Sequence, residues 1–174
     1  MYVILGLILC LTLAAPALAA PAQFTGAVFG VTDGDTITVL APDMQQVKIR
    51  LYGIACQERG REFWSRAKQA TADAVFGKRV TVQPMDTDRY GRIVAVVIMP
   101  GGKSLNEHLV REGLAWVDPQ YCKQEDICAL LRKLEKGAKG QQKGLWVDKT
   151  PIPQQDWMIR PGGGGPNIPG GAPR

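Results

Sequence analysis

Residues 31–58 read VTDGDTITVLAPDMQQVKIRLYGIACQE, and this stretch carries the clearest structural pattern in the sequence. Polar and apolar residues alternate over 35–40 and again over 46–51, which is the period of half-buried β-strands. The spacer at 41–44 contains Pro42 and has the length of a hairpin loop. The stretch therefore predicts two neighbouring antiparallel strands.

The two predicted strands bring charged residues to one end. Asp35 opens the first strand and Arg50 lies near the end of the second, and these ends are neighbours in an antiparallel pair. Glu58 follows on the segment that leaves the second strand. A carboxylate and an arginine at one rim suit an anionic substrate, because the planar guanidinium group matches the oxygens of a phosphate.

The chain beyond this stretch predicts further short strands and three helices. The run at 93–99 is continuously apolar, as expected of a strand buried on both sides. Ser104 and Glu107 form a capping box at the start of a helix that Gly113 ends. Five short strands with a helix between the third and the fourth have the connectivity of an OB-fold. The other elements predicted are a strand at 22–32, a helix at 61–76, a strand at 79–84, a short extended piece at 114–117 and an amphipathic helix at 127–138.

Three blocks make the chain similar to a known family. DGDT at 33–36, IRLYGI at 49–54 and DRYGR at 88–92 resemble the thermonuclease (staphylococcal nuclease-like) family in order and spacing, over roughly residues 24–147. The resemblance implies a mainly β fold with helices: a five-stranded OB-fold barrel plus three α-helices. It also implies a nuclease of the secreted bacterial type that hydrolyses phosphodiester bonds of DNA and RNA with little sequence preference.

The resemblance assigns catalytic and metal-binding roles to single residues. Arg50 and Arg92 stand at the family's two arginine positions, and Glu58 stands where a carboxylate positions or deprotonates the attacking water. Calcium is the metal that the family implies. Asp35 then supplies one carboxylate to the ion, and Cys56 supplies its backbone carbonyl.

Substrate contacts also follow from the resemblance. It places Tyr90 and Tyr121 at the mouth of the site, where an aromatic ring stacks on a base for about 1–3 kcal/mol. Arg89 adds attraction for phosphate at the same place.

Position 55 departs from the family pattern. Where the family has G-I-D-x-P-E, this chain has GIACQE at 53–58, so Ala55 replaces an aspartate that binds the metal. Even the loss of an outer contact typically lowers metal affinity or activity about 10- to 100-fold. Glu58, Asp33 and Asp86 are the carboxylates that could compensate. Three functions stay open: a nuclease, a catalytically weakened or inactive OB module that binds single-stranded nucleic acid, or a periplasmic stability or adaptor domain with no nucleic-acid role.

The cysteines outside the N-terminal segment are Cys56, Cys122 and Cys128. A disulfide between Cys122 and Cys128 is favoured, while pairing of Cys56 with either of them stays open. The sequence contains no zinc signature, since His108 is the only histidine and no second Cys/His pair is present. We interpret Cys56 as a structural residue rather than a nucleophile, because no histidine near it in the sequence could activate it.

The two ends of the chain differ in character from its middle. Residues 1–20 carry no charge and end in small residues, which predicts a secretory signal peptide. Residues 151–174 are rich in Gly and Pro and predict a disordered tail, which leaves 21–150 as the folded domain. The 21 Lys+Arg exceed the 16 Asp+Glu to give a net charge of +5, which agrees with a polyanionic substrate. We expect a secreted or periplasmic monomer that acts on single-stranded DNA or RNA, without stable membrane association after signal cleavage.

Overall fold

The computed structural model describes residues 22–147 of the chain. The predicted signal peptide at 1–20 and the predicted tail at 151–174 lie outside these residues. No helix within 22–147 is long and apolar enough to cross a bilayer. The elements, in chain order, are β1 (Phe24–Asp33), β2 (Thr36–Leu40), β3 (Gln46–Leu51), β4 (Ile54–Ala55), α1 (Trp64–Val75), β5 (Arg79–Thr87), β6 (Ile93–Ile98), α2 (Leu105–Arg111), β7 (Trp116–Val117), α3 (Glu125–Gly140) and the 3₁₀-helix η1 (Gly144–Val147).

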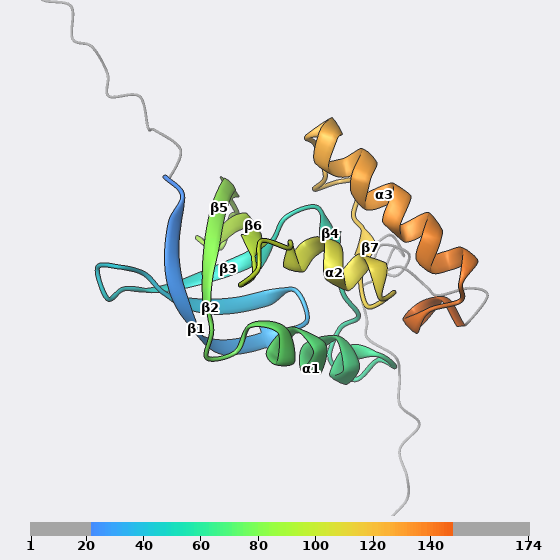
Figure 1. The fold of residues 1–174 in the computed structure, drawn as a ribbon, viewed down its shortest axis with the longest axis horizontal. Helices are drawn as coiled ribbons and strands as arrows, with labels where there is room; N and C mark the ends of the chain where they lie inside the picture. Colours follow the sequence, from blue (N-terminus) through green and yellow to red (C-terminus); the bar gives the residue numbers. More distant parts are fainter. Residues whose placement is uncertain (1–21, 148–174) are drawn as a thin grey trace, which may run out of the picture.

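Five strands close into a barrel in the order β1-β2-β3-β6-β5. β3 and β6 run parallel, and the other neighbouring pairs, including β5 with β1, run antiparallel. The barrel lies on one side of the molecule, α1 lies beneath it, and α3 lies farthest from it (Figure 1). Because α1 connects the third and fourth barrel strands, the predicted five-stranded OB-fold with three α-helices is confirmed.

The structure differs from the predicted elements in three places. β5 continues past Pro84 to Thr87, with a register shift between Pro84 and Asp86, so this proline lies at an irregularity of the strand rather than at its end. The first helix begins at Trp64, because Phe63 before it has a left-handed φ of 66°. β4 and β7 pair as a second, two-stranded sheet, which no alternation pattern could reveal because each strand has only two residues.

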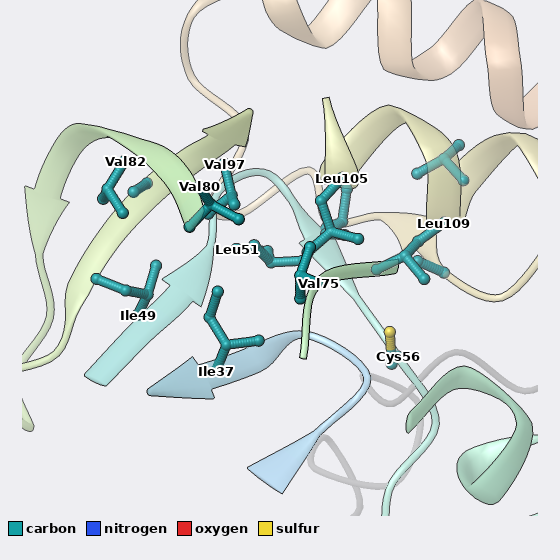
Figure 2. Packing of buried hydrophobic residues seen from close by; sticks show 14 of the residues in the cluster. Ile37, Ile49, Leu51, Cys56, Val75, Val80, Val82, Val97, Leu105 and Leu109 are labelled. Carbon is teal, nitrogen blue, oxygen red and sulfur yellow. The ribbon is translucent and has the colours of Figure 1, made fainter. Parts of the chain in front are cut away.

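The barrel interior is filled by the inward-facing residues of its strands. Figure 2 shows Ile37, Ile49, Val80 and Val82 pointing into this core, each exposed by 2% or less. The opposite face of β6 is covered as well, since Val96 packs with Tyr52 and Cys128 in a second cluster. The central part of β6 is therefore buried on both sides, as its apolar sequence predicts. The helices add Val75, Leu105 and Leu109 to the main core.

Asn106 is a buried polar residue that joins α2 to the barrel. Its Oδ1 accepts a hydrogen bond from the Val97 N–H at 3.0 Å, and its Nδ2 donates to the carbonyls of Tyr52 at 3.0 Å and Ala95 at 3.3 Å. The side chain of Ser104 caps the same helix by accepting from the Glu107 N–H at 3.3 Å, as the capping box predicts. These bonds hold α2 against the strands that carry the site described below.

Helix α3 is attached at its N-terminus in two ways. Cys122 and Cys128 form a disulfide, which confirms the favoured pairing and leaves Cys56 free and buried. The hydroxyl of Tyr52 accepts hydrogen bonds from the N–H groups of Lys123 at 2.8 Å and Gln124 at 2.7 Å. A residue that directly follows β3 therefore satisfies backbone donors at the start of a helix far along the chain.

Candidate active site

Asp35 and Arg50 meet at one rim of the barrel. Thr36 is the register partner of Arg50 in the β2–β3 pair, so Asp35, immediately before β2, lies beside the arginine. Arg50 Nη1 and Asp35 Oδ2 are 3.2 Å apart. This contact is the one that the pairing of the two strand ends predicts. Asp35 is only 8% exposed, so the ion pair is screened less by water than a surface pair is.

Two further donors fix the Asp35 carboxylate. The N–H of Cys56 donates to Oδ2 at 2.9 Å, and the hydroxyl of Thr36 donates to Oδ1 at 3.0 Å. The first bond connects the end of β4 to the β1–β2 turn. Glu58 lies two residues beyond this connection, half-buried, and its carbonyl accepts from the Arg61 N–H at 3.0 Å. The chain thus turns at Glu58, close in sequence to the anchored Cys56.

Arg92 is held by the turn that joins β5 to β6. Its Nε lies 2.6 Å from Asp88 Oδ2, while Asp88 Oδ1 accepts from the N–H groups of Tyr90 and Arg92, each at 2.9 Å. Burial raises the pKa of Asp88, but the hydrogen bonds from Arg92 and Tyr90 outweigh burial and lower this pKa below its usual value. Because the ion pair uses Nε, the two terminal nitrogens of Arg92 remain for an anionic substrate.

The parallel pairing of β3 and β6 places both arginines on one surface. Arg50 pairs with Val94 and Ile49 with Ile93, so Arg92, one residue before β6, continues the register on the outer face with Arg50. Two residues along the strand and one strand across correspond to a Cα separation of roughly 8 Å. Two long guanidinium side chains at this separation can reach one phosphate group.

Ala55 lies in an apolar cluster. It is 1% exposed, pairs with Trp116 in the β4–β7 sheet, and packs with Trp116 and Leu145 in a small cluster that Phe63 and Trp146 border. The family's expected carboxylate is therefore replaced by a methyl group among aromatic and aliphatic side chains. The Nε1 of Trp146, buried in this area, has no hydrogen-bond partner within residues 22–147.

The carboxylates that could replace the missing one have other partners. Asp33 Oδ1 accepts from Trp64 Nε1 at 2.9 Å, and Asp86 Oδ1 accepts from the Thr87 N–H at 2.8 Å. The described residues contain no group of three or more His, Cys, Asp or Glu side chains placed to hold a metal. Asp35 and the Cys56 carbonyl, the ligands that the sequence predicts, would supply only two of the six to eight oxygen ligands that calcium usually needs.

Cys56 is a structural residue. Its side chain belongs to the main core and is 3% exposed. Burial, reinforced by the charge of Asp35 and opposed by that of Arg50, raises the pKa of the thiol well above its usual value. A thiol that stays protonated is a poor nucleophile, which agrees with the interpretation from sequence.

The predicted substrate-contacting side chains lie on the surface. Tyr90 is 69% and Tyr121 57% exposed. The guanidinium carbon of Arg89 lies 4.9 Å from the centre of the Tyr90 ring, and Arg89 Nη2 donates to the Tyr90 hydroxyl at 2.7 Å. Arg92 approaches the same ring at 5.6 Å. Tyr90 is therefore bordered by two cations, next to the arginine expected to bind the scissile phosphate.

Two residues that shape the site, Asp88 and Trp64, were given no role by the sequence analysis. Asp88 has a local signal, since the spacing Asp-x-x-x-Arg with Gly91 between them suits a turn in which the carboxylate folds back on the arginine. Trp64 has none, because its bond to Asp33 joins the start of α1 to the end of β1 and depends on the complete fold.

Comparison with known proteins gives a consistent result. The family model described as staphylococcal nuclease homologue matches residues 48–148. A micrococcal nuclease of Shigella flexneri is 40% identical over 147 residues, which covers 80% of this chain and 82% of the relative. An uncharacterized endonuclease of Escherichia coli is 37% identical over 139 residues, covering 80% of this chain and 88% of the relative. An uncharacterized endonuclease of Haemophilus influenzae is 34% identical over 130 residues, which covers 75% of this chain and 70% of the relative.

Proposed function

Since the chain belongs to the staphylococcal nuclease homologue family, we propose that it is an exported endonuclease that hydrolyses phosphodiester bonds of DNA and RNA with little sequence preference. The observation that carries this proposal is the pair of arginines, Arg50 and Arg92, on one outer face of the barrel beside Asp35. Contacts to phosphate and to base faces carry no sequence information, so little sequence preference follows from such a site.

In the proposed reaction, water attacks the phosphorus atom and the P–O bond to the leaving nucleoside breaks. Glu58 accepts the proton of the attacking water, and the nucleoside oxygen that leaves takes up a proton. Arg50 and Arg92 hold the two non-bridging oxygens and neutralise the charge that builds on them. Asp35 keeps Arg50 in place through their 3.2 Å contact, and Asp88 keeps Arg92 in place through its Nε.

Calcium is proposed as a weakly bound cofactor. Asp35 and the carbonyl of Cys56 would hold it, with water completing the coordination, and a bound cation supplies further charge neutralisation at the phosphate. The residues in place fit this ion only in part, because position 55 is apolar and both oxygens of Asp35 already have partners in Arg50, Cys56 and Thr36. We therefore expect half-saturation at higher calcium concentrations than a site with two carboxylates requires.

Cleavage of a labelled single-stranded DNA and of an RNA, with calcium and with chelator, tests the proposed function. We expect calcium-stimulated cleavage of both substrates by the full chain without residues 1–20. The Arg50→Ala/Arg92→Ala double variant, purified in parallel, controls for a contaminating nuclease. No cleavage, together with binding that weakens as salt rises, would instead support the module that only binds nucleic acid, for which the apolar setting of Ala55 is the specific argument.

Replacing Ala55 by aspartate tests whether the site retains the geometry for calcium. We expect calcium affinity to rise about 10- to 100-fold, because a carboxylate returns to the position where the family has an aspartate ligand. The measurement is the calcium dependence of cleavage, together with calorimetric titration of the metal.

Ala55→Asn is the matched control for this substitution, because asparagine has the same shape without the charge. A gain in calcium affinity that is seen with aspartate and absent with asparagine supports the proposed metal position. Equal calcium affinity of the two variants would show that a carboxylate at position 55 does not reach the ion.

A further inference from the structure

The start of α1 carries an indole ring that two cations approach. Arg59 approaches the Trp64 ring with its guanidinium carbon 5.3 Å from the ring centre, and Lys68 approaches with its ammonium nitrogen at 5.4 Å. Cations at these distances are attracted by the ring's π electrons. Trp64 Nε1 donates to Asp33 Oδ1 at 2.9 Å, which fixes the ring against the end of β1. We call Arg59, Trp64 and Lys68 the indole platform.

The indole platform borders the proposed active site. Asp33, which holds the indole, is two residues before Asp35, and the turn between them also carries Gly34. Arg59 directly follows Glu58, the proposed base. The carbonyl of Gly34 accepts a hydrogen bond from the buried hydroxyl of Thr71 on α1 at 2.6 Å. The helix and the β1–β2 turn are thus bonded at two points, so the platform has a defined position beside the rim.

The cations near the platform have no carboxylate partners in the part of the chain described. The segment 58–68 contains four cations, at 59, 61, 66 and 68, against two carboxylates, at 58 and 62. None of the four forms a salt bridge within residues 22–147, whereas the salt bridges there engage Arg50, Arg92, Arg111, Arg132, Lys139 and Lys143. A positively charged surface without internal carboxylate partners is complementary to a polyanion.

We propose that the indole platform binds the phosphates of a single-stranded nucleic acid that flank the scissile phosphate, with Arg59 and Lys68 as the phosphate ligands and Trp64 as the fixed support for both. This inference rests on the proposed nuclease function and adds an extended binding site to it. The cations gain from being held in place before the strand binds, because less side-chain freedom is lost on binding. A substrate that ends close to the scissile bond does not reach the platform.

The test compares a long and a short substrate in the Arg59→Gln/Lys68→Gln double variant. For a 16-nucleotide single strand, we expect KM to rise about tenfold at physiological salt while kcat stays within twofold of wild type. For a dinucleotide, both constants should stay within twofold. Anisotropy titrations of the 16-mer are done under conditions that prevent cleavage. The magnitude of the slope of log affinity against log salt should fall by about 1.4, as expected for two lost phosphate contacts to a single strand.

Lys133→Gln/Lys136→Gln is the matched control, because it removes the same charge from two exposed positions on α3. The proposal is overturned if the control raises KM for the 16-mer as much as the platform variant does. It is also overturned if the platform variant raises KM for the dinucleotide as much as for the 16-mer, or if it leaves the salt dependence of 16-mer affinity unchanged. Since the binding titration needs no catalysis, an inactive wild-type protein would refute the proposed nuclease function while the platform could still be tested by its salt slope.

Discussion

Replacing Arg92 by alanine should lower kcat for single-stranded DNA at least about 100-fold, because a fixed donor to the developing charge is typically worth 10²- to 10³-fold. The ion pair with Asp88 at 2.6 Å holds the side chain, so the enzyme does not need to order it during the reaction. Cleavage rates under single-turnover conditions and under steady-state, multiple-turnover conditions measure the change. Unfolding by urea should show that the variant remains folded.

Arg89→Ala is the control for this change, since Arg89 belongs to the same turn and is exposed. We expect Arg89→Ala to raise KM a few-fold and to leave kcat nearly unchanged, because the Arg89 side chain attracts substrate without contacting the scissile phosphate. An unchanged kcat in Arg92→Ala would remove Arg92 from the mechanism. Equal losses in kcat for the two variants would show a general disturbance of the turn instead.

The second large effect concerns stability, and it is expected for Asn106→Leu. Leucine has the same branched arrangement of side-chain heavy atoms but leaves the Val97 N–H and the Tyr52 carbonyl without their hydrogen bonds in a buried place. Each buried unsatisfied group costs about 1–3 kcal/mol, so we expect a loss of about 3–5 kcal/mol in the free energy of unfolding. Urea denaturation followed by tryptophan fluorescence measures it.

Arg111→Leu serves as the comparison on the same helix. Its ion pair with Glu107 at 3.4 Å is exposed, so its loss should cost no more than about 1 kcal/mol. If Asn106→Leu lowered the free energy of unfolding as little as Arg111→Leu does, the buried amide would not be what fixes α2 to the barrel.

Local patterns were sufficient to predict most of the fold. Alternation predicted β2 and β3, the capping box predicted the start of α2, and an apolar run predicted β6, because each of these signals lies within a few neighbouring residues. The pairing of β4 with β7 was not predictable, because a two-residue strand has no period and its partner lies far along the chain. The extension of β5 was missed because proline is usually a sign that a strand ends, whereas here the strand continues through a register shift.

The candidate site also has one part that the sequence predicted and another part that required the structure. The contact of Asp35 with Arg50 follows from pairing two adjacent strands, so the sequence sufficed. The sequence also shows that Ala55 is not a ligand, but the aromatic surroundings of Ala55 come from β7 and η1 and required the structure. The bond between Trp64 and Asp33, which decides that Asp33 has another partner, likewise depends on how α1 packs against β1.

The parallel pairing of β3 with β6 has a consequence for when the protein can act during its own synthesis and folding. Arg50 and Arg92 become neighbours only across this pairing, and α1 and β5 lie between them in the chain. Long-range parallel contacts form late, since the entropy of closing a long loop must be overcome first. A partly synthesised or unfolded chain therefore presents its two phosphate-binding arginines separately. The surface that carries both arginines is therefore complete only when β6, the last barrel strand in the chain, has paired with β3.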